Sequence, residues 1–487
     1  MVSSMEMGQI FAEITDLLRC GETLAARQQL DAVRENVPAD EMWRWHELYG
    51  AVFHDLADAE GAAAAYSNAA KCDKYLRSQR QHFSNYLFAL HYLPGLGAAD
   101  FAQQHKIYGS LYRDEEVLPP RQGIMHSRLR IGFMAEDFCD SAAARFYEAL
   151  VTGFDVRYAE VYLYALSRDE DAFTHRLQAW GLTYRCLAEQ SLADMAAAIR
   201  WDEIDVLIDL TGHTAGGLTL MVLARKPAPV QLSAIGYFDT TGLTAVDGLL
   251  TDKQLNPTAA EQAFFSEELI YLPQALCFTP APAMQQLKRQ PRRAGAVTFG
   301  CFQNYMKLNR EVLAAWRQIM AACPGARLIV QDTTRLPGRR QMVERRLENA
   351  GLPMERVEVR LGTDNYLADY QEIDIMLDTF PYNGGAMTAT ALYMGVPVVT
   401  LRGAYHSARF GASLLTAAGH SEWIADDVAG YIKNALQLAS NPEFLADTQL
   451  YLREDISQAP LLDSQSYGEA VWQAIVALWG RKGDFAL

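Results

Sequence analysis

The sequence lacks the segments that direct a chain to a membrane or across it. Its N-terminus, MVSSMEMGQIFAEITDLL, has no basic region followed by an apolar core, which is the pattern of a signal peptide. No uninterrupted apolar run approaches the ~20 residues of a membrane-spanning helix. We therefore expect a cytoplasmic protein with no membrane partner.

Paired cysteines are also missing. The seven cysteines are scattered, odd in number and never spaced as C-x-x-C. This pattern is typical of reduced thiols and argues against structural zinc. Basic residues are few, since 43 stand against 59 acidic residues and give a net charge of −16. Such a balance argues against general affinity for nucleic acid or for an anionic membrane surface.

The residues that are present suit a large globular protein. The 487 residues are half hydrophobic, enough for about three domains of ~150 residues each. We expect residues 1–118 to form an all-α domain, because strand-like alternation is almost absent there. WHELYGAVFHDLADAEGAAAAYSNAA matches a tetratricopeptide helix pair, in which small residues let the helices touch and aromatics fill the gaps, at Gly50, Phe53, Ala62, Tyr66 and Ala69. Residues 7–42 look like a more degenerate copy, and a generic helical bundle is the alternative.

Beyond a linker at Pro119, Pro120 and Arg121, short apolar strands alternate with helices. One set runs through LRIGFMAEDF, RYAEVYLYAL, IDVLIDLTG and VQLSAIGY, and a second through AVTFGCF, ARLIVQD, VEVRLG, IDIMLDTF and PVVTL. This alternation predicts parallel sheets with crossover helices. We expect two α/β domains, at residues 126–288 and 296–455, separated by the basic linker RQPRRAGA (289–296) and followed by a C-terminal helix at 456–487.

The stretch DTFPYNGGAMTATALYMGVPVVTL (378–401) contains a tight turn between a strand and a helix. The strand ends near Asp378, NGG (383–385) forms the turn, and a helix begins near Met387. Open α/β sheets bind ligands at the carboxyl ends of their strands, and free N–H groups at such a turn attract phosphate together with the helix dipole. Glycine turns at these junctions also occur for purely geometric reasons, so both interpretations stay open.

Several distinctive motifs occur in a specific order: DLTGHTAGG with ARKPAPVQLSAIGY, DTTGLTAVDGLLTD, TFGCFQNYMKLN, and DTFPYNGGAMTATALYMGVPVVTLRGAYHSARFGASLL. Together they resemble the catalytic region of O-GlcNAc transferase and its SPINDLY relatives, over about residues 80–440. The resemblance implies a GT-B glycosyltransferase with two Rossmann-like domains and a nucleotide-sugar donor in the cleft between them. It also implies inversion at the anomeric carbon, no required metal or cofactor, and tetratricopeptide repeats ahead of the catalytic core.

The donor site follows from the same resemblance. Lys307 matches the family's diphosphate-binding lysine, with Gln303 and Asn304 beside it, although an isolated lysine is by default a surface residue. The nucleotide base is expected near Thr363, Tyr366 and Leu367, and Tyr366 could equally be a core aromatic at helical spacing from Tyr370. The remaining donor candidates are Asn383, Gly384, Gly385, Ala386, Met387, Thr388, Thr390 and His406.

The candidate proton acceptors are His213 and Asp137. His213, in DLTGHTAGG, suits acceptor contact or proton transfer near neutral pH, and a loop histidine bonded to backbone is the alternative. Asp137 lies in EDFCDSAAARF. A hydroxyl acceptor must lose a proton as its oxygen attacks, so the reaction needs a base or a proton relay.

Four positions depart from the family pattern. Ala386 and Met387 stand where the family has threonines, Thr390 replaces a carboxylate, and Ser141 replaces a histidine. The sequence predicts an inverting, metal-independent transferase that moves a sugar from a UDP- or GDP-sugar, such as UDP-GlcNAc, to a protein or peptide side chain. A catalytically degenerate binding partner and a transferase for a small-molecule acceptor are the alternatives. Self-association into a homo-oligomer is left open.

Overall fold

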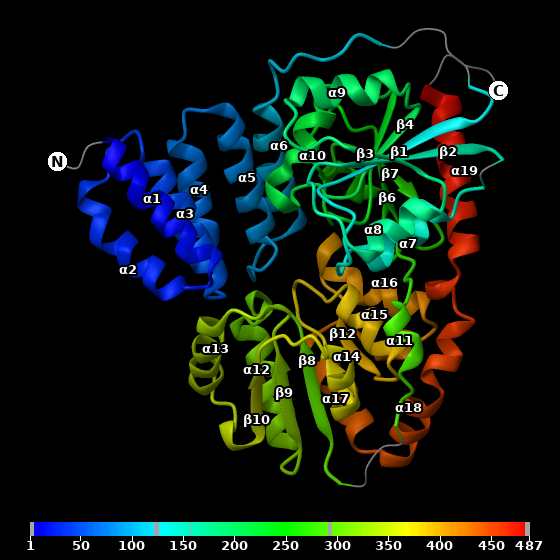
Figure 1. Cartoon of the computed structure of the whole chain (residues 1–487). Coiled ribbons are helices and arrows are strands. Elements are labelled where there is room, and N and C mark those ends of the chain that lie inside the picture. The colour runs from blue at the N-terminus through cyan, green and yellow to red at the C-terminus, as the bar shows by residue number, and fades with distance from the viewer. Residues whose placement is uncertain (1–3, 121–125, 156, 291–294, 483–487) are drawn as a thin grey trace. The chain divides into compact units, whose positions relative to one another are not determined.

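The computed structural model describes residues 4–120, 126–155, 157–290 and 295–482. Contacts within the chain divide it into two compact units, each assembled from segments far apart in the sequence (Figure 1). Unit 1 comprises Met1–Leu96, Gln286–Gly403 and Glu422–Arg453, and unit 2 comprises Gly97–Gln285, Ala404–Ser421 and Glu454–Leu487. Arg121 of the first linker and residues 291–294 of the basic linker lie outside the described residues.

The N-terminal part of the chain is helical, as predicted. The helices are α1 (Ser4–Arg19), α2 (Thr23–Val33), α3 (Met42–Asp55), α4 (Ala59–Cys72), α5 (Leu76–Leu90) and α6 (Ala98–Ser110). A Cβ on Gly50 of α3 would lie 2.4 Å from the Tyr66 ring of α4, and a Cβ on Gly61 would lie 2.7 Å from the Phe53 ring. Small residues therefore let α3 and α4 touch while aromatics fill the gaps, which is the packing expected of a tetratricopeptide helix pair.

Unit 2 contains a parallel sheet of seven strands. The strands are β1 (Leu129–Ala135), β2 (Ala159–Ala165), β3 (Thr183–Cys186), β4 (Val206–Asp209), β5 (Val230–Ser233), β6 (Gly248–Thr251) and β7 (Glu268–Tyr271), in the order β3-β2-β1-β4-β5-β6-β7. Every pairing is parallel, and Ile131 of β1 lies opposite Val206 of β4. The helices of this unit are α6, α7 (Ala144–Thr152), α8 (Ala172–Ala179), α9 (Leu192–Trp201), α10 (Leu218–Leu223), α16 (Phe410–Ala417) and α19 (Ser464–Lys482).

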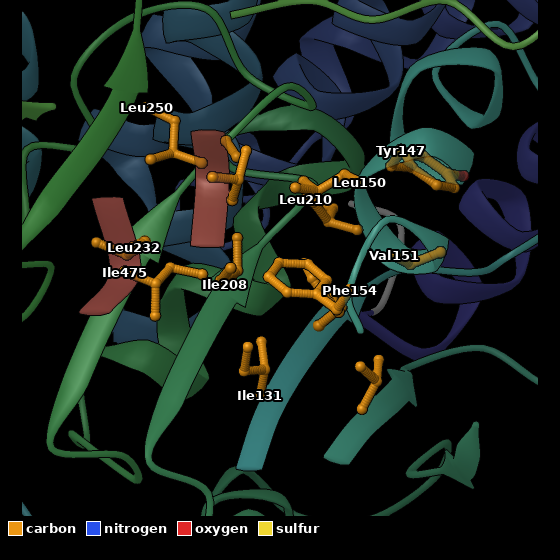
Figure 2. Close-up of a cluster of buried hydrophobic side chains, with 14 of the residues drawn as sticks. Ile131, Tyr147, Leu150, Val151, Phe154, Ile208, Leu210, Leu232, Leu250 and Ile475 are labelled. Atoms are coloured by element: carbon orange, nitrogen blue, oxygen red, sulfur yellow. The ribbon is translucent and has the colours of Figure 1, made fainter. Parts of the chain in front are cut away.

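The core of unit 2 joins the sheet to helices from both ends of its sequence. Figure 2 shows Ile131, Ile208 and Leu232 of the strands beside α7 and α19. Leu150 of α7 and Ile475 of α19 are fully buried there. The predicted C-terminal helix therefore packs on the first parallel sheet. Helix α19 and strand β1 of this sheet are more than 300 residues apart in the sequence.

Unit 1 contains the second parallel sheet. Its strands are β8 (Thr298–Phe302), β9 (Arg327–Gln331), β10 (Val357–Arg360), β11 (Ile375–Leu377), β12 (Val398–Leu401) and β13 (Ile424–Ala425), in the order β10-β9-β8-β11-β12-β13. The helices around them are α12 (Arg310–Ala322), α13 (Pro337–Asn349), α14 (Tyr366–Asp369), α15 (Ala386–Tyr393), α17 (Val428–Ala439) and α18 (Pro442–Ser457), and the short α11 (Pro282–Gln286) leads into this unit. Both sheets share the 3-2-1-4-5-6 order of a dinucleotide-binding fold. The prediction of two Rossmann-like domains after an all-α region is confirmed.

All nine strands predicted from apolar runs are present, and the described residues contain four others that were missed. The missed strands are β3, β6, β7 and β13, each of two to four residues. β3, β7 and β13 are edge strands, which need one neighbour only and so carry a weak apolar signal. The buried β6 lies in the run GLLTD, whose length is too short for periodicity to decide between strand and helix.

Two segments group with unit 2 although the sequence-based boundaries assign them elsewhere. Residues 97–118 were assigned to the helical domain, and residues 404–421 to the second α/β domain. The domain boundaries stay predictions. Among the described helices, none is both long enough and apolar enough to span a bilayer.

Candidate active site

The turn after β11 is held by a buried carboxylate. Asp378 accepts hydrogen bonds from the N–H of Thr379 at 2.9 Å, the N–H of Gly384 at 2.7 Å and the hydroxyl of Thr400 at 2.7 Å. Burial raises the pKa of Asp378 to about 6. The N–H of Gly384 is therefore engaged inside the protein, and the groups left to meet a ligand at this turn are the first amides of α15, which no helix can satisfy internally.

Lys307 reaches this turn from the loop after β8. Its Nζ donates to the carbonyl of Asn383 at 2.8 Å and to Oε1 of Gln303 at 3.3 Å, and it lies 3.9 Å from the centre of the Tyr382 ring. Only 8% of Lys307 is exposed. Burial lowers its pKa to about 8, and the nearby Asp378 opposes that shift. The default of a solvated surface lysine is therefore wrong for Lys307.

Three buried polar groups near the turn have no hydrogen-bond partner in the described part of the chain. They are Nε2 of Gln303 and the hydroxyls of Thr388 and Thr390. A Cβ on Gly384 would lie 2.0 Å from Nε2 of Gln303 and 2.4 Å from Oγ1 of Thr388, so only glycine permits this approach. Buried polar groups are normally paired, so the unpaired groups of Gln303 and Thr388 beside Gly384 are ones that a polar ligand would complete.

The side chains expected near the nucleotide base lie at the start of α14. Thr363 is exposed and donates to Asp369 at 3.3 Å, Tyr366 is half-buried, and Leu367 is buried. The core aromatic of this segment is Tyr370, whose ring packs 4.9 Å from that of Phe302 and whose hydroxyl reaches the carbonyl of Met387 at 3.4 Å. Because the buried Tyr370 fills the core position, the half-buried Tyr366 is not the core aromatic of this segment.

Asn304 has a different role from its neighbour Gln303. Its Oδ1 accepts from the N–H of Met306 at 3.0 Å and caps the 3-10 turn η4 (Tyr305–Lys307) that carries Lys307. The same oxygen accepts from Arg339 at 3.1 Å. The loop-capping alternative for Asn304 thus has direct contacts in its favour.

His213 belongs to unit 2 and is fully buried. It follows β4, where Asp209 accepts from the N–H groups of Thr211 at 3.0 Å and Gly212 at 2.9 Å and so shapes the DLTGHT loop. The Nε2 of His213 donates to the carbonyl of Thr241 at 3.0 Å. Burial lowers the pKa of His213 well below its usual value. His213 is therefore a neutral imidazole whose Nε2–H is engaged by backbone.

Aromatic rings enclose His213. The rings of Tyr108, Tyr237 and His105 lie 4.5, 4.8 and 5.1 Å from it, centre to centre. His105 accepts from the Tyr237 hydroxyl at 2.8 Å and donates to the carbonyl of Phe101 at 2.7 Å. Helix α6 therefore fixes the imidazole of His213 within unit 2.

Asp137 is more accessible than His213. It is half-buried after β1, and its Oδ1 accepts from the N–H of Cys139 at 2.8 Å. Ser141, at the position of the expected histidine, is exposed and accepts from the N–H of Ala144 at 3.2 Å at the start of α7. Of the two candidate proton acceptors, Asp137 is the one that solvent can reach.

His406 lies in unit 2, whereas every other donor candidate lies in unit 1. It begins η7 (His406–Arg409), and its Nδ1 donates to Oδ1 of Asn256 at 2.9 Å. Burial, followed by the charge of Arg409, lowers the pKa of His406 to about 3. Arg409 in turn bonds Glu261 at 2.9 Å. The expected role of His406 near the donor stays a prediction.

Sequence reasoning missed Tyr382, whose ring faces the ammonium of Lys307. The only feature of the sequence that could have pointed to Tyr382 is its position directly before NGG. Within the described residues, no group of three or more His, Cys, Asp or Glu side chains is arranged to hold a metal ion.

The chain has a helical region followed by two parallel Rossmann-like sheets, and a lysine and a glycine turn lie at strand ends of the second sheet. This combination defines a protein of the GT-B class. The structure is similar to that of a mutant of the O-GlcNAc transferase of Thermobaculum terrenum, with a TM-score of 0.84 and 27% identity over 98% of this chain and 97% of that one. Residues 110–290 and 284–471 match the model of glycosyl transferase family 41. The chain belongs to this family.

Curated relatives agree with this assignment. The chain is 33% identical over 419 residues to a Petunia hybrida protein named "Probable UDP-N-acetylglucosamine–peptide N-acetylglucosaminyltransferase SPINDLY", covering 82% of this chain and 44% of that protein. It is 26% identical over 378 residues to the Arabidopsis thaliana protein of the same activity name called SEC, covering 74% of this chain and 38% of that one. The chain spans less than half the length of these relatives. The resemblance inferred from its motifs is confirmed.

Proposed function

We propose that the chain is an inverting, metal-independent glycosyltransferase that moves a sugar from a UDP-sugar to a protein or peptide side chain. The observation that carries this proposal is the buried ammonium of Lys307, whose hydrogen-bond acceptors are a carbonyl and an amide oxygen rather than a carboxylate. A buried cation held by neutral groups favours an anionic ligand. The names of its relatives make UDP-N-acetylglucosamine the first donor to test.

The proposed chemistry assigns separate roles to the two units. In unit 1, Lys307 and the first amides of α15 neutralise the nucleoside diphosphate as its bond to the anomeric carbon breaks. In unit 2, Asp137 accepts the proton that the acceptor hydroxyl loses as its oxygen forms the new bond to that carbon. His213, buried and neutral, holds the loop after β4 in this scheme. The helical repeats help to present the acceptor.

Turnover is expected to survive chelation of divalent metal. Lys307 and the α15 amides supply the positive potential that a metal ion would otherwise provide to the leaving group. The measurement is transfer of labelled sugar before and after dialysis against EDTA. Activity that is lost on chelation and restored by Mn²⁺ or Mg²⁺ would contradict the metal-independent mechanism.

Affinity for UDP is expected to fall as the pH rises through about 8. The lowered pKa of Lys307 means that its ammonium, the form that attracts diphosphate, is present below about pH 8 and is lost above it. Binding then requires uptake of one proton, so affinity should drop by up to about tenfold per pH unit above this value. The terminal phosphate ionises at pH ~6 and the uracil N3–H only at pH ~9, so calorimetry between about pH 7.5 and 8.5 follows the protein group. In the Lys307→Ala variant the pH dependence should disappear, and an unchanged slope there would assign it to another residue.

A non-catalytic binding protein is the second candidate function. It is favoured by four departures at donor and catalytic positions: Ala386 and Met387 lack the hydroxyl of the expected threonines, Thr390 has a hydroxyl in place of a carboxylate, and Ser141 has one in place of an imidazole. Donor hydrolysis against a panel of UDP- and GDP-sugars separates the two functions, because a binding protein would retain nucleotide affinity without turnover. If donor turns over but no peptide is modified, the remaining alternative is a transferase for a small-molecule acceptor.

A further inference from the structure

Two arginines on α13 connect the helical region to the loop that carries Lys307. Arg339 and Arg346 are seven residues apart, so they lie two turns apart on one face of the helix. Each one bonds to backbone at the end of α3 and also to the loop after β8. All of these contacts lie within unit 1.

Arg339 makes the first connection. Its side chain is fully buried and pairs with the fully buried Asp332 at 2.8 Å. The guanidinium also donates to the carbonyl of His54, near the end of α3, at 3.0 Å, and to Oδ1 of Asn304 at 3.1 Å. Because Asn304 caps the turn that carries Lys307, Arg339 links that cap to the helical region.

Arg346 makes the second connection. It donates to the carbonyl of Ala57, between α3 and α4, at 2.6 Å. It also donates to the carbonyls of Leu308 at 3.2 Å and Tyr305 at 3.4 Å. The two arginines therefore form hydrogen bonds with the loop that carries Lys307 on both sides of that residue, at Asn304 and at Leu308.

The carbonyls at the end of α3 suit cationic partners. The carbonyl of His54 already accepts from the N–H of Ala57 at 3.0 Å, but it lies in the last turn of α3, where the negative end of the helix dipole favours a cation such as arginine. A third contact supports the same link: the ring of Tyr92, just after α5, lies 5.3 Å from the ring of Tyr382, which faces the ammonium of Lys307.

We propose that Arg339 and Arg346 are positioning residues that make nucleoside diphosphate binding at Lys307 depend on the α3–α4 turn of the helical region. This inference rests on the proposed function, in which Lys307 contacts the diphosphate. Coupling of this kind is reciprocal. A macromolecule that shifts the α3–α4 turn changes donor affinity, and donor changes the affinity for that macromolecule by the same factor.

The test is calorimetry of UDP with full-length variants. Arg346→Met is expected to weaken UDP binding about tenfold, and Arg346→Lys to restore part of the loss because it keeps the charge and some donors. Arg345→Met is the matched control, since Arg345 is the exposed neighbour on the same helix. Unchanged UDP affinity in an Arg346→Met variant with a normal melting temperature would overturn the proposal.

A double mutant distinguishes positioning from general stabilisation. If Arg346 acts through the Lys307 loop, Arg346→Met should add little to the loss caused by Lys307→Ala, whereas independent effects would multiply. If Lys307→Ala leaves UDP binding unchanged, the proposed function fails. If Lys307→Ala weakens binding and Arg346→Met does not, only the coupling fails.

A measurement on the wild-type chain covers the case in which the arginine variants do not fold. Saturating UDP should slow hydrogen exchange at the amides of the α3–α4 turn, residues 54–62, more than at those of α1. Equal or absent protection in the two segments would overturn the coupling.

Discussion

The Asp137→Asn variant is expected to transfer sugar about 10²–10⁴-fold more slowly than the wild-type chain, with unchanged affinity for UDP. Asparagine keeps the oxygen that accepts from the N–H of Cys139, so the loop after β1 should keep its shape. It cannot take a proton from the acceptor hydroxyl. The measurement combines a transfer assay with calorimetry of UDP, which separates chemistry from donor binding.

His213→Gln is the comparison for this prediction. Glutamine can still donate to the carbonyl of Thr241, as Nε2 of His213 does, but it is no base. We expect this variant to retain most of its transfer activity, because the buried and neutral His213 holds its loop. If His213→Gln abolishes transfer while Asp137→Asn leaves it intact, the roles of the two residues are reversed.

The Lys307→Ala variant is expected to bind UDP about 10–150-fold more weakly, since a charge-assisted hydrogen bond contributes about 1.5–3 kcal/mol. Turnover should fall further, because the ammonium interacts more strongly with the leaving diphosphate as its charge develops. Calorimetry gives the first quantity and transfer at saturating donor gives the second.

Lys433→Ala is the matched control for Lys307→Ala. Lys433 is exposed on α17 of the same unit, so its removal changes the net charge equally without touching the NGG turn. If the Lys307→Ala variant keeps its UDP affinity and turnover, the assignment of the anion site to Lys307 in unit 1 is wrong. The binding-protein alternative is then favoured.

Much of the fold could be predicted because local pattern and tertiary packing agree. The central strands β1, β4, β8 and β11 are mostly apolar, since a parallel sheet covered on both faces buries most of its side chains. The spacing of the tetratricopeptide-like repeat likewise predicted that Gly50 and Tyr66 lie where the two helices touch. Edge strands such as β13 gave no comparable signal, because one neighbour and partial exposure tolerate many residue types.

The candidate site was less predictable. Motif order pointed to Lys307 and the NGG turn, but the sequence did not say that the N–H of Gly384 donates its hydrogen bond to Asp378. It also did not say that His406 bonds Asn256 within unit 2. Such differences depend on which distant segments meet, and a loop residue's neighbours in sequence do not determine its neighbours in space.

The family, the two parallel sheets, the helical region before them and the residue types at the donor turn could all be inferred from the sequence. These follow from hydrophobic period, turn chemistry and motif order, which are local properties of the chain. The electrostatic state of each group, in contrast, depends on the folded structure. Lys307 has a lowered pKa and His213 is neutral because both are enclosed by segments remote in sequence, and desolvation depends on everything that surrounds a charge. The hydrogen bonds of Arg339 and Arg346 likewise connect α3 to the Lys307 loop only because the fold brings residues nearly 300 positions apart into contact.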